Sequence, residues 1–224
     1  MTGPRFDRYD WAGGRETMLR FGPDAGPLVV AVLPLFEEAN RTRAFLVEML
    51  RALAGRGIGS ILPDLPGTGE SLVETRDLRL PDLRQAFAAL VGTLDAPVYA
   101  VTIRSGALVD CDASLAGRWR LAPQAGGDLL RDLSRIRAAS TMPDEDVYAG
   151  NSLSAALLAD LREAVPCEDG GDASRTVRLE SDPRPADARY PGAPLWRRSE
   201  PGSDATLSDT LAADIAGWIA TCGG

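Results

Sequence analysis

Two residues that could take part in chemistry, Arg104 and Ser105, come just after the β-branched and aromatic run Val98–Thr102, with only Ile103 between. A short strand that enters a helix through a tight turn is the shape of a nucleophile elbow. The usual pattern is glycine, any residue, nucleophile, any residue, glycine, and positions 102–106 here contain Thr-Ile-Arg-Ser-Gly. Arginine stays protonated in proteins and cannot attack a carbonyl. The sequence therefore predicts the turn without the chemistry that it usually supports.

Histidine is absent from all 224 residues. No side chain therefore has an ordinary pKa near neutrality, and the usual general base is missing. This excludes Ser-His-Asp and Cys-His catalysis within one chain, and it excludes metal sites that contain histidine. Acid–base work would fall to carboxylates or to a thiolate.

Several carboxylates follow the predicted carboxyl ends of strands, namely Glu37, Glu38, Asp64, Asp182 and Glu200. A pair of them could act as general acid and base, or hold a divalent cation. For Asp64 we favour a hydrogen-bond acceptor that tightens its own loop. Asp182 could take the position of the acid in a triad, although there is no histidine for it to orient.

Arg104 admits two hypotheses. At the carboxyl ends of the strands, beside the free N–H groups of a helix N-terminus, it could bind a carboxylate or phosphate. The favoured alternative is internal neutralisation by Glu37 or Glu38, because buried charges are usually paired. Ser105 is expected to be structural, since an elbow directs the side chain of this residue away from the site.

The composition is that of an ordinary globular protein, with 45% hydrophobic residues and a net charge of −8. This charge makes binding to nucleic acid or to anionic membranes unfavourable, and no apolar run approaches the roughly 18 residues of a membrane span. Cys111, Cys167 and Cys222 are an odd set, far apart, which favours reduced thiols in a cytoplasmic protein. Residues 1–21 lack the apolar segment of a signal peptide. No cofactor is indicated.

Strands alternate with helices up to Pro123, which predicts a parallel sheet covered on both faces. The expected strands are 16–21, 28–33, 59–63, 98–102, 119–122, 176–180 and 195–197. The expected helices are 40–55, capped by Asn40, then 81–94, 105–113 and 206–221. Two further amphipathic helices, 128–139 and 154–165, follow each other without a strand between them. We therefore expect a single domain, 1–224, with a helical cap inserted at 124–166.

These features resemble the α/β-hydrolase superfamily. The resemblance depends on the Asp-x-Pro-Gly-x-Gly-x-Ser loop at 64–71 and on the elbow. A narrower resemblance is to the second subgroup of exosortase system-associated hydrolases, through Leu-Phe-Glu-Glu-Ala-Asn-Arg-Thr-Arg at 35–43 and through 102–106. It covers roughly residues 30–165, and Thr102 and Ser105 depart from the subgroup pattern. The resemblance implies a three-layer sandwich with a mostly parallel central sheet. It also implies hydrolysis and a link to surface polysaccharide production and protein sorting.

Two classes of function remain open. The first is a non-catalytic or accessory protein that binds a small anionic ligand or a protein partner. The second is an unconventional hydrolase of ester or related bonds that uses carboxylates or a bound metal, and a lipase-type pocket is a third, weaker alternative. Lack of histidine favours the first class, with no catalytic residue and no metal ligand assigned. The candidate pocket consists of Phe36, Glu37, Glu38, Asp64, Arg104, Ser105 and Asp182.

Overall fold

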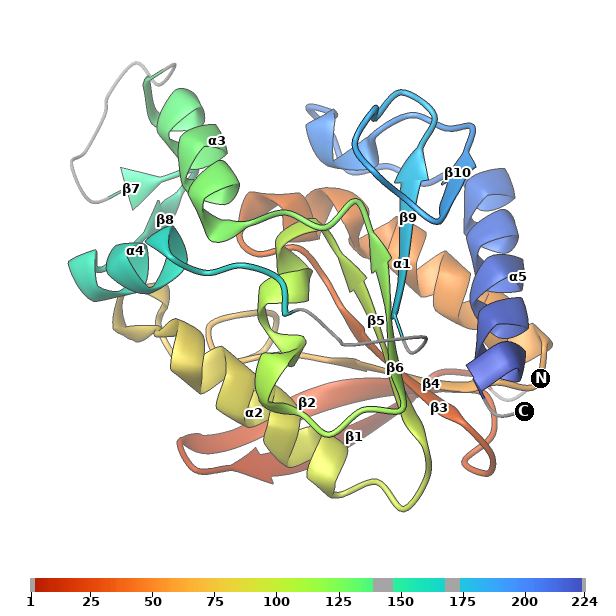
Figure 1. Ribbon diagram of the computed structural model, residues 1–224. Helices are drawn as coiled ribbons and strands as arrows, with labels where there is room; N and C mark the ends of the chain where they lie inside the picture. The colour runs from red at the N-terminus through yellow and green to blue at the C-terminus, as the bar shows by residue number, and fades with distance from the viewer. Residues whose placement is uncertain (1–2, 139–146, 168–173, 223–224) are drawn as a thin grey trace.

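The computed structural model describes residues 3–138, 147–167 and 174–222. These residues form an α/β fold around an eight-stranded sheet with the strand order β1-β2-β4-β3-β5-β6-β9-β10 (Figure 1). The strands are β1 (Arg5–Trp11), β2 (Gly14–Phe21), β3 (Leu28–Val32), β4 (Gly59–Pro63), β5 (Val98–Ile103), β6 (Gly117–Leu121), β9 (Ser174–Leu179) and β10 (Ala188–Tyr190). The helices are α1 (Glu37–Gly55), α2 (Leu80–Gly92), α3 (Gly126–Ala138), α4 (Ala155–Arg162) and α5 (Ala205–Cys222).

The sheet is mixed but mostly parallel. β1 and β2 run antiparallel to their neighbours, and every pairing from β4 through to β10 is parallel. The central strands β3, β4 and β5 are buried along their whole length, because helices cover both faces of the sheet. One apolar cluster packs α1 and α5 against one face, and a second packs α2, α3 and α4 against the other. The result is the expected three-layer arrangement.

Four local expectations were wrong. The elbow is followed by two 3-10 helices, η2 (Arg104–Leu108) and η3 (Asp110–Asp112), in place of one helix over 105–113. The last strand is β10, and the predicted strand 195–197 is the 3-10 helix η4 (Leu195–Arg197). Asn40 lies inside α1, whose N-terminal boundary is Phe36. A two-stranded hairpin, β7 (Val147–Tyr148) with β8 (Asn151–Ser152), stands between α3 and α4.

The segment 124–166, which we call the insertion, leaves the sheet after β6 and returns before β9. Its two ends meet, because the Gly126 N–H donates to the Ala164 carbonyl at 2.8 Å. A Cβ at position 126 would lie 1.9 Å from the Leu161 carbonyl oxygen, so only glycine permits this approach. The apolar side of the insertion packs with α2, through Leu129, Leu133, Leu157 and Leu161. Residues 139–146 lie outside the described part, so the predicted end of the first helix at 139 is not tested.

The expectation of three reduced thiols was wrong. Cys111 and Cys167 form a disulfide across 56 residues of sequence, with their Cα atoms 5.5 Å apart. Cys222 is a free thiol. Disulfides persist mainly in oxidising environments, so the cysteines no longer support the reducing compartment that we expected. Among the helices of the described residues, none has the length and apolar character to cross a membrane.

Candidate functional site

The elbow turn is present, and its backbone explains the residues around it. Arg104 has a φ of 54°, in the left-handed region that only a sharp turn imposes on a residue with a side chain. A Cβ at Gly106 would lie 2.6 Å from the Leu33 carbonyl oxygen, so glycine lets the turn approach the end of β3. Ser105 is fully buried, and its Oγ accepts a hydrogen bond from the Leu35 N–H at 2.9 Å. Ser105 therefore holds two loops together.

The guanidinium of Arg104 is buried and paired. Its Nε lies 3.1 Å from Glu38 Oε2, and one of its terminal nitrogens lies 3.3 Å from Glu38 Oε1. The same nitrogen lies 3.4 Å from Asp132 Oδ2, and the guanidinium carbon lies 5.4 Å from the centre of the Trp196 ring, a cation–π distance. The hypothesis of internal neutralisation is confirmed for Glu38.

This pairing follows from the sheet. β3 and β5 are parallel neighbours with Val32 opposite Thr102, so residues that follow the two strands meet at one edge. Glu38 starts α1 just beyond β3, and Arg104 stands directly after β5. The carboxyl ends of parallel strands are the edge where open α/β sheets place their ligand sites.

Burial raises the pKa of the Glu38 carboxyl, and the hydrogen bonds and charge of Arg104 oppose this shift. Burial also raises the pKa of Glu37, whose buried Oε2 has no hydrogen-bond partner. Glu37 therefore does not share the pairing of its neighbour, although both residues lie in the first turn of α1.

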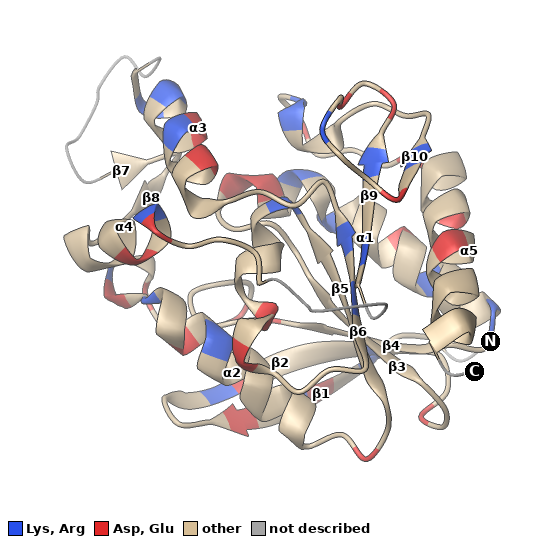
Figure 2. Cartoon of the chain, in the orientation of Figure 1, with Lys and Arg blue, Asp and Glu red and all other residues tan. Residues whose placement is uncertain are grey.

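A cavity of about 400 Å³ opens above the pair. We call it the arginine pocket, because five arginines and three aspartates line it, together with Gln124, Trp196 and residues of the loop after β9. The charged lining residues are Arg104, Arg131, Arg135, Arg184, Arg197, Asp128, Asp132 and Asp182. Figure 2 shows basic and acidic residues close together on α3, which forms one wall. An excess of positive charge at one pocket contrasts with a chain of net charge −8.

The aspartates of the arginine pocket are all engaged. Asp132 accepts from Arg104 and from the Gln124 side-chain amide at 2.8 Å, and it pairs with Arg135 at 3.2 Å. Asp128 pairs with Arg131.

Asp182 pairs with Arg184 at 2.6 Å and with Arg178 at 2.8 Å. The hydrogen bonds from Arg184 are the largest of several effects that hold the pKa of Asp182 far below its usual range. Asp182 is thus a permanent anion that positions the arginines around it.

The remaining candidate residues, Phe36, Asp64 and Glu200, lie outside the arginine pocket. Phe36 lines a separate cavity of about 410 Å³, between the turn after β3 and the loop after β4. Asp64 accepts from the Thr17 hydroxyl at 2.7 Å and from the Glu70 N–H at 3.2 Å, and it pairs with Arg43 at 3.5 Å. Asp64 therefore tightens its loop, as we had favoured. Glu200 is exposed and lines neither of these two cavities.

Sequence reasoning missed Asp132, Gln124 and the arginines of α3. Asp132 is one of several aspartates on an amphipathic helix, and nothing in its local pattern distinguishes it from a solvated one. Alternating arginines and aspartates along 128–137 are the only signal, and such a run usually marks a solvent-exposed face. Trp196, which lines the pocket, is buried.

The chain matches no protein-family model and no curated protein. Among solved structures it is similar to the epoxide hydrolase VrEH1 from Vigna radiata, with 20% identity and a TM-score of 0.44 over 53% of this chain and 39% of that one. It is also similar to Epoxide Hydrolase A from Mycobacterium thermoresistibile, with 23% identity and a TM-score of 0.45 over 53% and 39% of the two chains. It is similar as well to potato (Solanum tuberosum) epoxide hydrolase I, with 20% identity and a TM-score of 0.42 over 53% of this chain and 40% of that one.

These alignments span about two fifths of the length of the similar proteins. The α/β fold itself rests on the observed strand order and pairing. Within its described residues, the chain is an α/β protein with a mostly parallel eight-stranded sheet.

Proposed function

We propose that this chain is a non-catalytic protein that binds a small anion, a carboxylate or a phosphate, in the arginine pocket. The observation that carries the proposal is the gathering of Arg131, Arg135, Arg184 and Arg197 around a cavity at the carboxyl edge of the sheet. Guanidinium groups match the geometry of carboxylates and phosphates and can bind them with two parallel hydrogen bonds.

Arg104 has a different part in this proposal from the one its position first suggested. Its guanidinium is committed to Glu38 and Asp132, so it forms the neutralised floor of the pocket. The side chains of Arg131 and Arg135 are 66% and 77% exposed, so they can reach a ligand with little desolvation. Arg197 is exposed, and no carboxylate pairs with it among the described residues.

Three features support a non-catalytic role. The elbow position holds an arginine, Ser105 Oγ is engaged in the protein interior, and the chain has no histidine. The alternative, carboxylate-based hydrolysis, would need a carboxylate in the pocket that is free to exchange protons. The three lining aspartates are all bound to arginine, and no observation favours the alternative.

The resemblance to exosortase system-associated hydrolases supplies a context for this ligand. We propose that the chain acts beside such a system, as an accessory protein that responds to an anionic small molecule, with a protein partner as the receiver of that signal. The cytoplasmic location expected from the sequence stays part of this proposal.

The test is calorimetric titration with inorganic phosphate and with citrate, at low and at physiological ionic strength. Arg131→Gln and Arg197→Gln should each weaken binding about tenfold, because a hydrogen bond to a charged group contributes roughly 1.5–3 kcal/mol. Arg51→Gln is the matched control, since Arg51 is exposed on α1 and lines neither of the cavities described above. Equal weakening by all three variants would show a non-specific charge effect and would refute the proposal.

A further inference from the structure

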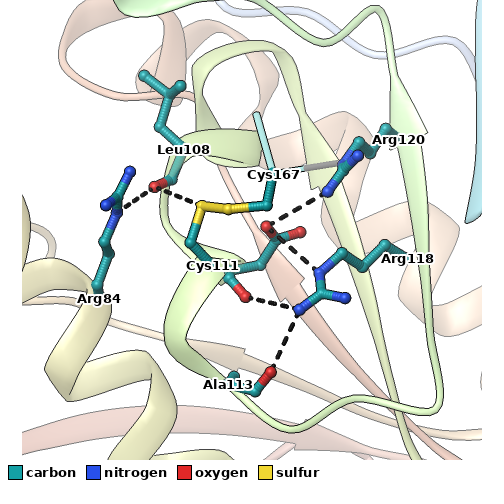
Figure 3. Close-up of a disulfide and its surroundings, with 8 residues drawn as sticks. Arg84, Leu108, Cys111, Ala113, Arg118, Arg120 and Cys167 are labelled. Atoms are coloured by element: carbon teal, nitrogen blue, oxygen red, sulfur yellow. Dashed lines mark hydrogen bonds and ion pairs between the residues drawn. A yellow bond between two sulfur atoms is a disulfide. The ribbon is translucent and has the colours of Figure 1, made fainter. Parts of the chain in front are cut away.

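The disulfide joins two parts of the chain that frame the arginine pocket. Cys111 belongs to η3, directly beyond the elbow, and Cys167 follows α4 at the end of the insertion (Figure 3). The insertion also carries α3, and with it Arg131, Arg135 and Asp132 of the pocket wall. The bridge therefore fixes the exit of the segment that supplies one wall of the pocket.

The bridge is accessible from outside. Cys111 and Cys167 are half-buried. Cys167 lines a groove of about 480 Å³ between the start of α2 and residues 160–167. The neighbouring Val165 is 61% exposed. A thiol-bearing partner can reach the Cys167 sulfur along this groove.

The elbow side of the bridge has its own anchors. Asp110 is fully buried, with Arg118 Nε at 3.7 Å and an Arg120 terminal nitrogen at 3.6 Å from one of its carboxylate oxygens. Arg118 also donates to the carbonyls of Asp110 and Ala113, each at 3.2 Å (Figure 3). These contacts do not depend on the sulfur–sulfur bond, so η3 stays in place when the bridge opens.

The insertion side is held by the apolar packing of α3 and α4 and by polar contacts that do not involve Cys167. The Gly126–Ala164 hydrogen bond joins the two ends of the insertion to each other, and the Gln124 N–H reaches the Arg104 carbonyl at 3.3 Å. Asp132 of α3 pairs with Arg104 at 3.4 Å. Asp160 of α4 forms a bidentate pair with Arg79, at 2.7 and 2.9 Å, and accepts from the Leu80 N–H at the start of α2. Opening the bridge thus removes the covalent tie at the end of the insertion, next to Cys167, whereas η3 keeps its own anchors.

We propose that Cys111–Cys167 is a redox modification site through which a dithiol reductant controls the arginine pocket; this inference rests on the proposed function of that pocket. A thiolate of the reductant attacks Cys167 Sγ and forms a mixed disulfide, and Cys111 leaves as a thiolate that takes a proton from water. The second thiol of the reductant then loses its proton and attacks the reductant's first sulfur, the one now bonded to Cys167. Cys167 leaves as a thiolate, which is protonated in turn.

The net change is two electrons and two protons transferred from the dithiol to the bridge, and the reductant becomes a disulfide. In the reduced chain the Cys111 S–H can donate to the Leu108 carbonyl oxygen, which already lies 3.8 Å from its sulfur. Cys167 has no such partner among the described residues, so the end of the insertion is released while η3 keeps its sulfur in place.

The experiment uses the full chain with Cys222→Ser, so that Cys111 and Cys167 are the only cysteines that can be alkylated. The folded protein is incubated with dithiothreitol and then alkylated, and mass spectrometry counts the modified cysteines. Phosphate affinity and hydrogen exchange in α3 are measured for the oxidised chain, the reduced chain and a Cys111→Ser/Cys167→Ser variant. Asp214→Ala is the control for general destabilisation, since α5 lies on the opposite face of the sheet.

The proposal expects two alkylated cysteines without unfolding, faster exchange in α3, and phosphate binding weaker by about fivefold or more, the lower end of allosteric couplings. The double-serine variant should match the reduced chain, and Asp214→Ala should not. Reduction that occurs only on unfolding would overturn the proposal, as would reduction that leaves both exchange and affinity unchanged. If neither form binds phosphate but reduction speeds exchange in α3, the anion-binding function fails while redox control of the pocket wall stands.

Discussion

Replacement of Arg104 by methionine tests the central feature of the site. The side chains of Arg104 and Glu38 are only 7% and 9% exposed, and two hydrogen bonds join them. Methionine keeps most of the volume and leaves the Glu38 carboxylate buried without its cation. Removing one partner of such a buried pair lowers the free energy of unfolding by about 3–5 kcal/mol. Asp132 adds less, because it is 39% exposed and also pairs with Arg135.

The pH dependence provides a second readout. Burial already raises the pKa of Glu38, and without Arg104 nothing comparable opposes it. A carboxyl whose pKa is higher in the folded chain than in the unfolded chain contributes stability at low pH, and this contribution is lost as the pH rises through the folded pKa. The loss in free energy of unfolding caused by Arg104→Met should therefore be largest at neutral pH. It should become smaller as the pH is lowered toward the ordinary pKa of glutamate.

The assay is urea unfolding followed by tryptophan fluorescence at several pH values. Adding Glu38→Met to Arg104→Met should restore more than half of the loss, because the unpaired charge is then removed as well. A loss below about 1 kcal/mol, equal at all pH values, would refute the buried-pair interpretation. If Arg104→Met leaves the stability unchanged but phosphate no longer stabilises the chain against unfolding, Arg104 itself binds the anion.

Four further predictions follow from contacts described above. Ser105→Ala should cost about 1–3 kcal/mol, because it leaves a buried N–H without an acceptor, and a fluorophosphonate probe should not label the unmodified chain; stoichiometric labelling at this serine would show a catalytic role. Gly106→Ala should cost about 1–3 kcal/mol by forcing a methyl group against backbone oxygens, whereas Gly92→Ala, with open space around it, should leave the urea midpoint unchanged or raise it. Glu37→Gln should raise the melting temperature at neutral pH but not near pH 4, because burial raises the pKa of this carboxyl and its stabilising protonated form is lost as the pH rises; a pH-independent effect would contradict this. Deletion of 124–166 should expose the apolar surface of α2 and cause aggregation in light scattering, and a soluble, equally stable deletion variant would mean that the segment is not a cap.

Local signals made the elbow and its ion pair predictable. The β-branched run before Arg104 marks a buried strand, and the small residues after it permit a sharp turn. The same reasoning predicts Glu37 or Glu38 as the partner of Arg104, because the loop that carries them faces the elbow in this kind of fold, and the structure selects Glu38. Such reasoning works where the chemistry depends on strand ends, whose neighbours are fixed by topology.

The features that sequence reasoning missed depend on contacts between distant segments. The disulfide closes 56 residues, and three widely spaced cysteines give no indication of which two meet. β10 has three residues between prolines, so its pattern is too short to distinguish a strand from a loop. Asp132 reaches Arg104 only through the way α3 folds back over the sheet, which no local periodicity encodes.

The meeting of Gly126 and Ala164 has a consequence for how this protein can change over time. Because the two ends of the insertion meet at Gly126 and Ala164, the path between these two residues does not set the pairing of β6 with β9. For a flexible closed segment, doubling the length adds only about 0.6 kcal/mol of closure entropy. The length of the insertion can therefore change while the register of the sheet stays the same, provided that the apolar side that packs with α2 is kept.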